Sequence, residues 1–233
     1  MKGLSSRWEN RQTVAGFASS GPNEVLLAFA ERFLGGSQRP RCLDIGCGAA
    51  RNALPLARLG FRVVAADLSA PMIEAAQARI LATPARPAVD LVLAPMSPLP
   101  FADGTFDLIV AHGVWNLATS GAAFRNAIEE AGRVARTGAG LFLFTFSRRT
   151  LAASARPDPD ESFVFSCWNG EPQCFLDETE LLNELGRAGF ERDTPGPLTE
   201  YNVMPASKLR TRGGPPVIYE GTFIRTDPLR SAP

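Results

Sequence analysis

Two aspartates and a glycine turn are the residues of this chain best suited to bind a ligand. Asp44 lies near the end of one apolar run, just before Gly46 and Gly48, and Asp67 ends the next apolar run. Turn glycines let a ligand approach the backbone closely, and a carboxylate after a second strand can bind both hydroxyls of a ribose. This spacing indicates a site for an adenosine-containing cofactor.

These residues must be positioned by a strand, a turn, a helix and a second strand. The apolar runs predict strands over 41–45 and 61–67, with a helix over 51–59 between them that ends at Gly60. Ser69 then has the residue type of a helix N-cap. The remaining predicted elements are helices over 23–34, after Ser69 with Met72, Ala76 and Ile80 on one face, and over 124–134 and 178–188. Further strands are predicted over 89–93, 106–111, 141–146, from 190, and over 217–225.

Alternating strands and helices predict an α/β fold. We expect a Rossmann-like, doubly wound and mostly parallel seven-stranded sheet, with the last strand antiparallel and helices on both faces. We expect a single domain over 1–233, with 1–39 as an N-terminal cap segment and helix. The segments 147–176 and 195–216 are predicted acceptor-site insertions, because connections of this length are usually functional or mobile. The sequence of 147–176 is equally consistent with a lid over the substrate and with a surface loop that has its own small core.

The amino-acid composition of the chain argues against several kinds of binding partner. Lys+Arg and Asp+Glu both number 24, and no basic cluster stands out, so nucleic acid is not expected as a partner. The four cysteines form no CxxC pair and His112 is the single histidine, so no metal site is expected. The chain has no apolar stretch of signal-peptide or membrane-spanning type, which predicts a cytoplasmic protein without a membrane partner. A monomer or homodimer is expected.

Five segments in the same order resemble the motifs of class I S-adenosylmethionine-dependent methyltransferases. They are Leu-Asp-Ile-Gly-Cys-Gly-Ala-Ala-Arg-Asn at 43–52, Val-Ala-Ala-Asp-Leu-Ser at 64–69, and the segments 99–110, 133–143 and 175–190. The Arg-Asn pair at 51–52 is most similar to the small-molecule branch (methyltransferase type 11/12), which includes the tellurite-resistance methyltransferases. The resemblance covers roughly residues 40–195, and the shared order makes it specific.

The resemblance implies S-adenosylmethionine as cofactor, with S-adenosylhomocysteine as product. It assigns the methionine end to the backbone of Gly46 to Gly48, the ribose hydroxyls to Asp67 and the adenine face to Leu68. Asp44 is expected to orient the turn or to reach the ammonium group, and Arg11 to pair with the methionine carboxylate. The full set of predicted cofactor-binding residues is Trp8, Arg11, Asp44, Gly46, Cys47, Gly48, Asp67, Leu68, Met72, Met96, Ser97 and Ala111.

Two positions depart from the family pattern. Ala50 replaces the third glycine of the turn, so ordinary backbone dihedral angles are expected there. Pro95 stands where the family usually has an acidic residue that binds the adenine amino group. Met96 and Ser97 are therefore expected to cover the adenine.

The acceptor is expected next to His112, just past the fourth predicted strand. A neutral imidazole there can serve as a general base, and it can equally serve as a wall of the cofactor pocket. Trp115 and Asn116 are expected to shape the floor of the acceptor site. The predicted substrate-binding residues are His112, Trp115, Asn116, Trp168 and Tyr201.

The predicted function is methyl transfer to an oxygen, nitrogen, sulfur or metalloid nucleophile of a small molecule by in-line displacement. One alternative is a nicotinamide-dependent oxidoreductase on a similar fold, but its fingerprint requires a glycine where this chain has Arg51. Another alternative is a non-catalytic module that binds S-adenosylmethionine and acts through a partner.

Overall fold

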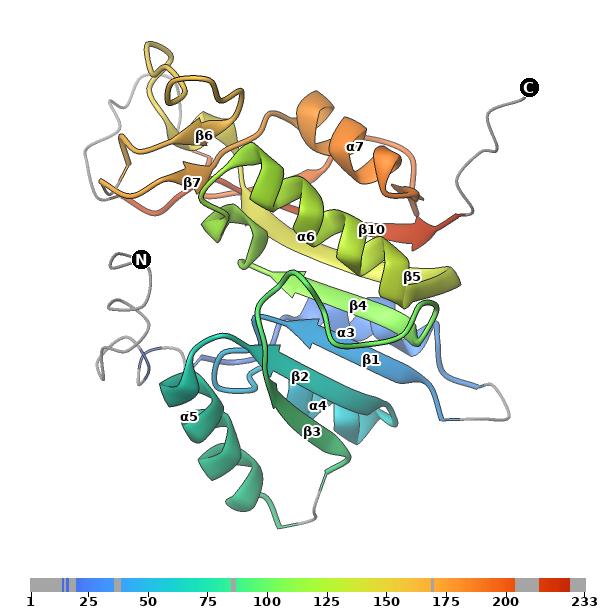
Figure 1. The fold of residues 1–233 in the computed structure, drawn as a ribbon. Helices are drawn as coiled ribbons and strands as arrows, with labels where there is room; N and C mark the ends of the chain where they lie inside the picture. The colour runs from blue at the N-terminus through green and yellow to red at the C-terminus, as the bar shows by residue number, and fades with distance from the viewer. Residues whose placement is uncertain are drawn as a thin grey trace.

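The computed structural model of the chain describes residues 14, 16, 20–35, 39–84, 87–168, 170–203 and 214–226. Its centre is an eight-stranded sheet with helices on both faces (Figure 1). The strands of this sheet are β1 (Arg41–Ile45), β2 (Arg62–Asp67), β3 (Val89–Leu93), β4 (Phe106–His112), β5 (Ala135–Phe146), β8 (Phe190–Arg192), β9 (Thr199–Tyr201) and β10 (Ile218–Arg225). The α-helices are α3 (Glu24–Glu31), α4 (Ala53–Leu59), α5 (Ala70–Leu81), α6 (Gly121–Val134) and α7 (Glu178–Arg187).

The strand order is β3-β2-β1-β4-β5-β10-β8, and β9 pairs with β10. Strands β1 to β5 are parallel, whereas β10 runs antiparallel to each of its neighbours. The predicted α/β class with an antiparallel last strand is confirmed, and the short strand β9 adds an eighth member. The chain moves outward from β1 to β3 and then crosses to the other side of β1 to form β4. Such a switch leaves a crevice at the carboxyl ends of β1 and β4, where open α/β sheets bind ligands.

The strands bury alternate side chains in two cores, one on each face of the sheet. In β1, Cys42 packs in the core beneath α3, α4 and α5, whereas Leu43 packs in the core beneath α6 and α7. Figure 1 shows α3 and α4 behind the sheet and α6 and α7 in front of it. Because both faces are covered, the central strands are almost entirely apolar.

Helix caps fix the elements that begin beside the crevice. Ser69 caps α5 by accepting a hydrogen bond from the backbone of Met72 at 3.3 Å, as its residue type predicted. Asn23 caps α3 by accepting from the backbone of Leu26 at 3.0 Å. Both caps tie a helix start to the site edge of the sheet.

The insertion 147–176 contains a 3₁₀ turn, η2 (Arg148–Thr150), and a hairpin of β6 (Val164–Phe165) and β7 (Gln173–Cys174). It builds a small core from Leu151, Phe165 and Phe175, against which Trp168 packs. Within the residues that the structure describes, no helix is long and apolar enough to cross a bilayer.

Candidate cofactor site

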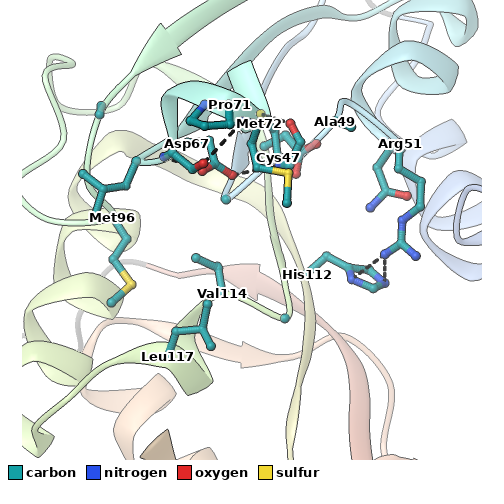
Figure 2. Close-up of a pocket in the computed structure, with 18 of the residues that line it drawn as sticks. Cys47, Ala49, Arg51, Asp67, Pro71, Met72, Met96, His112, Val114 and Leu117 are labelled. Carbon is teal, nitrogen blue, oxygen red and sulfur yellow. Dashed lines mark hydrogen bonds between the residues drawn. The ribbon is translucent and has the colours of Figure 1, made fainter. Parts of the chain in front are cut away.

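A cavity of about 440 Å³ opens at the carboxyl ends of β1, β2 and β4 (Figure 2). It lies at the switch point of the sheet. The predicted site residues that line it are Asp44, Gly46, Cys47, Gly48, Asp67, Leu68, Met72, Met96 and His112.

Asp44 presents a buried carboxylate to this cavity. The side chain is 1% exposed, and its Oδ2 atom has no hydrogen-bond partner among the described residues. Burial raises the pKa of Asp44 from 3.8 to about 7, although the positive charge of Arg51 partly opposes this rise. A buried oxygen without a partner is costly, so a ligand that donates a hydrogen bond or carries a positive charge would be stabilised here.

The turn after β1 brings bare backbone to the cavity. Gly46 has φ of 67°, and a Cβ atom at this position would lie 2.5 Å from Cγ2 of Val114. Gly48 has φ of 52°. A side chain at position 46 would therefore be excluded both by backbone conformation and by lack of space.

Ala50 contradicts the prediction of ordinary dihedral angles in this turn. Its φ is 58°, in the left-handed region, and its backbone N–H donates to the carbonyl of Cys47 at 3.1 Å. Ala50 therefore adopts the conformation that a glycine would favour. Its small side chain is fully buried in the core beneath α4. This conformation costs an alanine about 1–2 kcal/mol.

Asp67 ties the end of β2 to the glycine turn. Its Oδ2 accepts a hydrogen bond from the backbone of Gly48 at 2.9 Å, and its Oδ1 accepts from Ser69 at 2.8 Å. Burial raises the pKa of Asp67, and these backbone hydrogen bonds oppose the rise. A carboxylate oxygen can accept more than one hydrogen bond, so both oxygens retain the capacity to bind hydroxyl groups.

Cys47 is a packing residue rather than a nucleophile. Burial and the nearby aspartates raise the pKa of its thiol far above the ordinary value, so the reactive thiolate is not formed near neutral pH.

His112 faces Arg51 at the end of β4 (Figure 2). Nη2 of Arg51 lies 2.9 Å from Nδ1 of His112 and 3.3 Å from Nε2. A guanidinium can only donate, so Nδ1 is the acceptor and the ring hydrogen lies on Nε2. Burial and the charge of Arg51 lower the pKa of His112 to about 3. A ring that binds protons this weakly, with a lone pair already used, is a poor general base, so the structure favours its role as a pocket wall.

Polar side chains continue behind His112. Nδ2 of Asn23 lies 3.4 Å from Nε2 of His112 and donates to Glu220 at 2.7 Å, and the hydroxyl of Tyr201 donates to the same carboxylate at 2.7 Å. The His112 ring also stacks on Phe144, with centroids 4.2 Å apart. These contacts join the ends of β4, β5 and β10 to the start of α3.

Several predicted site residues lie away from the cavity. Ala111 and Trp115 are buried in the core beneath α6, and Asn116 is only 1% exposed beside them. Trp168 packs on Phe175 in the insertion. The predicted residues that do not line the cavity are Ser97, Ala111, Trp115, Asn116, Trp168 and Tyr201. Their roles in binding stay predictions, because sequence position near a strand end does not determine which way a side chain points. Trp8 and Arg11 lie outside the described residues.

The cavity also uses residues that the sequence analysis did not assign. Arg51 and Asn52 were recognised only as part of a motif, although both line the cavity from the start of α4. Val114 and Leu117 supply apolar wall after β4. The described residues contain no group of three or more His, Cys, Asp or Glu side chains that could hold a metal ion.

The part of the chain that contains this site is similar to known proteins. Residues 43–144, which include the turn, β2 and β4, match the family described as "Methyltransferase domain". The chain is 31% identical over 112 residues to a demethylmenaquinone methyltransferase of Renibacterium salmoninarum, covering 48% of this chain and 43% of that protein. It is 29% identical over 167 residues to norajmaline N-methyltransferase of Rauvolfia serpentina, covering 70% of this chain and 56% of that protein. The chain thus spans about half the length of these curated relatives.

The fold has close neighbours among solved structures. A protein of Methanosarcina mazei described as an S-adenosylmethionine-dependent methyltransferase has a TM-score of 0.63 at 21% identity, covering 85% of this chain and 97% of that one. The fold is therefore similar to that of the Methanosarcina mazei protein, and residues 43–144 are similar to the methyltransferase-domain family.

Proposed function

We propose that the protein transfers a methyl group from S-adenosylmethionine to a small, partly apolar acceptor. The observation that carries this proposal is the cavity at the carboxyl ends of β1, β2 and β4, in which the buried Oδ2 of Asp44 has no partner. The match of residues 43–144 to a methyltransferase family supports the same activity.

The chemistry of the cavity fits the cofactor. Asp44 would bind the ammonium group of its amino-acid end, and the bare turn at Gly46 and Gly48 would let that end approach the backbone. Asp67 would accept hydrogen bonds from the ribose hydroxyls. Leu68 lines the cavity and is 72% exposed, as expected of a side chain that packs on the adenine.

When bound, S-adenosylmethionine supplies a methyl group on a positively charged sulfur, which is displaced by a nucleophile in line with the carbon–sulfur bond. The protein contributes mainly by holding the acceptor in line and by excluding water. Apolar wall for this purpose comes from Met96, Val114 and Leu117. His112 would orient Arg51 and close the wall rather than remove a proton, because its pKa is about 3.

The acceptor class follows from the lining and from the relatives. The part of the cavity after β4 is lined mainly by small and apolar side chains, including Ala118 and Ala123. The two curated relatives are named for demethylmenaquinone and norajmaline. Both the lining and these names favour a ring-containing small molecule as the acceptor, and the segment 195–216 remains a predicted contributor to its site.

The central test is the affinity for S-adenosylhomocysteine, measured by isothermal titration calorimetry. Asp67→Ala is expected to weaken binding by about 100-fold, because it removes charge-assisted hydrogen bonds worth about 1.5–3 kcal/mol in total and loosens the turn. Asp90→Asn, an exposed aspartate on the neighbouring strand β3, is the matched control and should bind as the wild type does. Unchanged affinity in Asp67→Ala would contradict the site assignment.

Turnover is tested with methyl-labelled S-adenosylmethionine and a panel of quinones, phenols and amines. Labelled product from at least one acceptor is the expected result. Tight binding of the cofactor without product across the panel would favour the non-catalytic module. Displacement of S-adenosylhomocysteine by NAD would favour the oxidoreductase.

A further inference from the structure

Glu220 places a buried carboxylate near the start of β10, close to the end of β4. The residue is 4% exposed, and its Oε2 accepts a hydrogen bond from Nδ2 of Asn23, which lies 3.4 Å from Nε2 of His112. Among the described residues, no nitrogen of a Lys, Arg or His side chain lies within 4.0 Å of this carboxylate. Since a buried charge is costly without an opposite charge nearby, a cationic group of a ligand would be stabilised here.

Tyr201 connects this carboxylate to the surface. Its hydroxyl donates to Oε1 of Glu220 at 2.7 Å, and its side chain is exposed. This hydrogen bond raises the pKa of Tyr201 to about 12, so the hydroxyl keeps its proton and directs it at Glu220. The lone pairs of the Tyr201 oxygen are then available to accept a hydrogen bond from a ligand. A ligand therefore meets Tyr201 first, with the negative charge of Glu220 directly behind it.

A row of three rings joins Tyr201 to the cavity. The His112 ring lines the cavity, its centroid lies 4.2 Å from that of Phe144, and the Phe144 centroid lies 6.3 Å from that of Tyr201. Phe144 is only partly buried. Gly113 lines the cavity beside His112, and a Cβ atom there would have no described atom within 4 Å. Open space therefore adjoins the row where it meets the cavity, and an apolar ligand could extend from there to Tyr201.

We propose that the methyl acceptor carries a protonated amine, which donates a hydrogen bond to Tyr201 and is stabilised by the negative charge of Glu220. The apolar part of the acceptor would lie along Phe144 and His112, and its reacting atom would reach the cavity. The amine is then the anchoring group and not the methylated atom, since Tyr201 lies outside the cavity. Glu220 acts through Tyr201 and is a positioning residue. This inference rests on the proposed function, because it names the chemical class of the acceptor.

The test compares two probes that differ in one polar group. Phenethylamine is a cation at pH 7, because aliphatic amines have a pKa of about 10, whereas phenethyl alcohol is neutral and of similar size. Each probe is titrated into the full chain saturated with S-adenosylhomocysteine, and dissociation constants are taken from the chemical shifts of isotope-labelled backbone amides. The wild type should bind phenethylamine about 10-fold more tightly than the alcohol, with the largest shifts in β9 and β10.

Three variants assign this preference to individual side chains. Glu220→Gln keeps the size of the side chain but removes its charge, and it should lose the preference through weaker binding of phenethylamine alone. Glu191→Gln removes an exposed charge from β8, which also pairs with β10, and should keep the full preference. Tyr201→Phe removes the acceptor oxygen and should weaken phenethylamine by about 3- to 10-fold. All three should bind S-adenosylhomocysteine within about twofold of the wild type, which a disrupted fold would not allow.

Four results would overturn the proposal. Equal affinity of the wild type for both probes, or no binding of phenethylamine, would mean that no site selects an amine. A preference that survives in Glu220→Gln would assign it to another charge. Loss of the preference in Glu191→Gln as well would indicate an effect of net charge. If Glu220→Gln does not fold, Tyr201→Phe decides, and unchanged affinity of this variant for phenethylamine would contradict the proposal.

The same titrations separate this inference from the proposed function. A wild type that binds S-adenosylhomocysteine but shows no preference between the probes removes only the amine anchor. Failure of the wild type to bind S-adenosylhomocysteine at all would remove the proposed function and this inference together.

Discussion

Asp44 shows how the position of one residue links binding to pH. Its pKa is raised to about 7 because the carboxylate is buried, and an ammonium ligand would favour the ionised form. Below pH 7 a ligand must first displace the bound proton. Binding and proton release are therefore expected to be coupled at this residue.

The affinity for S-adenosylhomocysteine should rise with pH up to about 7 and then level off. Below the pKa of Asp44 the ionised fraction falls about tenfold per pH unit, so the affinity should approach that slope. Calorimetry in two buffers with different ionisation enthalpies should detect proton release near pH 6. Asp44→Asn should bind weakly at every pH and abolish the dependence, and a slope that persisted in this variant would have to come from another group.

Without a ligand, the free energy of unfolding changes with pH in the opposite direction to the affinity. The folded-state pKa of Asp44 lies above its ordinary value of 3.8, so the folded state binds the proton more tightly than the unfolded state. The free energy of unfolding therefore falls as pH rises from about 4 to about 7. Asp44→Asn should remove this contribution, and thermal unfolding at pH 5 and pH 8 would measure it.

At the scale of elements, the insertion 147–176 is organised around its own core rather than around the cavity. Phe165 and Phe175 are buried within it, and none of its described residues lines the cavity. The described part of 147–176 therefore forms a loop with its own small core. Its role as a lid stays a prediction.

The variant Trp168→Ala tests that prediction. It should lower the free energy of unfolding by about 1–2 kcal/mol, because an aromatic contact with Phe175 is lost. It should leave the affinity for S-adenosylhomocysteine within about twofold of the wild type. Leu68→Ala, which changes the cavity itself, is the control that should weaken binding. A raised KM for the acceptor in Trp168→Ala, without a change in cofactor affinity, would support the lid.

Local sequence signals predicted most of the elements. Apolar runs and the cap Ser69 placed α5 and the central strands, because these features act over a few residues. The strand β5 begins at Ala135, well before the predicted 141; Ala135 and Gly140 pair with Phe106 and Leu108 of β4, with an irregular register between them. The contact between Arg51 and His112 was not predicted, because it depends on how the start of α4 sits against the end of β4.

At the scale of the whole molecule, the ligand should stabilise the fold. The cavity is formed by three strands and by the starts of α4, α5 and α6, so a bound cofactor would contact elements from both halves of the sheet. A ligand that binds only the folded state stabilises it by about 2.7 kcal/mol at 100 times its dissociation constant. For a chain of this length the melting temperature should rise by about 5–10 °C.

Differential scanning calorimetry with and without S-adenosylhomocysteine measures this shift. Asp67→Ala should show little shift at the same ligand concentration, whereas Asp90→Asn should show the full one. A shift of similar size with NAD would contradict selectivity for the methyl-donor cofactor.

The hydrogen bond from the backbone of Gly48 to Asp67 joins the first two turns of the site before any ligand is bound. Among the described residues, this hydrogen bond would hold the nucleoside end of the site in position for a ligand. Product departure from this end would then be limited by breaking contacts with the nucleoside and not by opening a gate. Any slow step in the catalytic cycle would have to arise on the acceptor side.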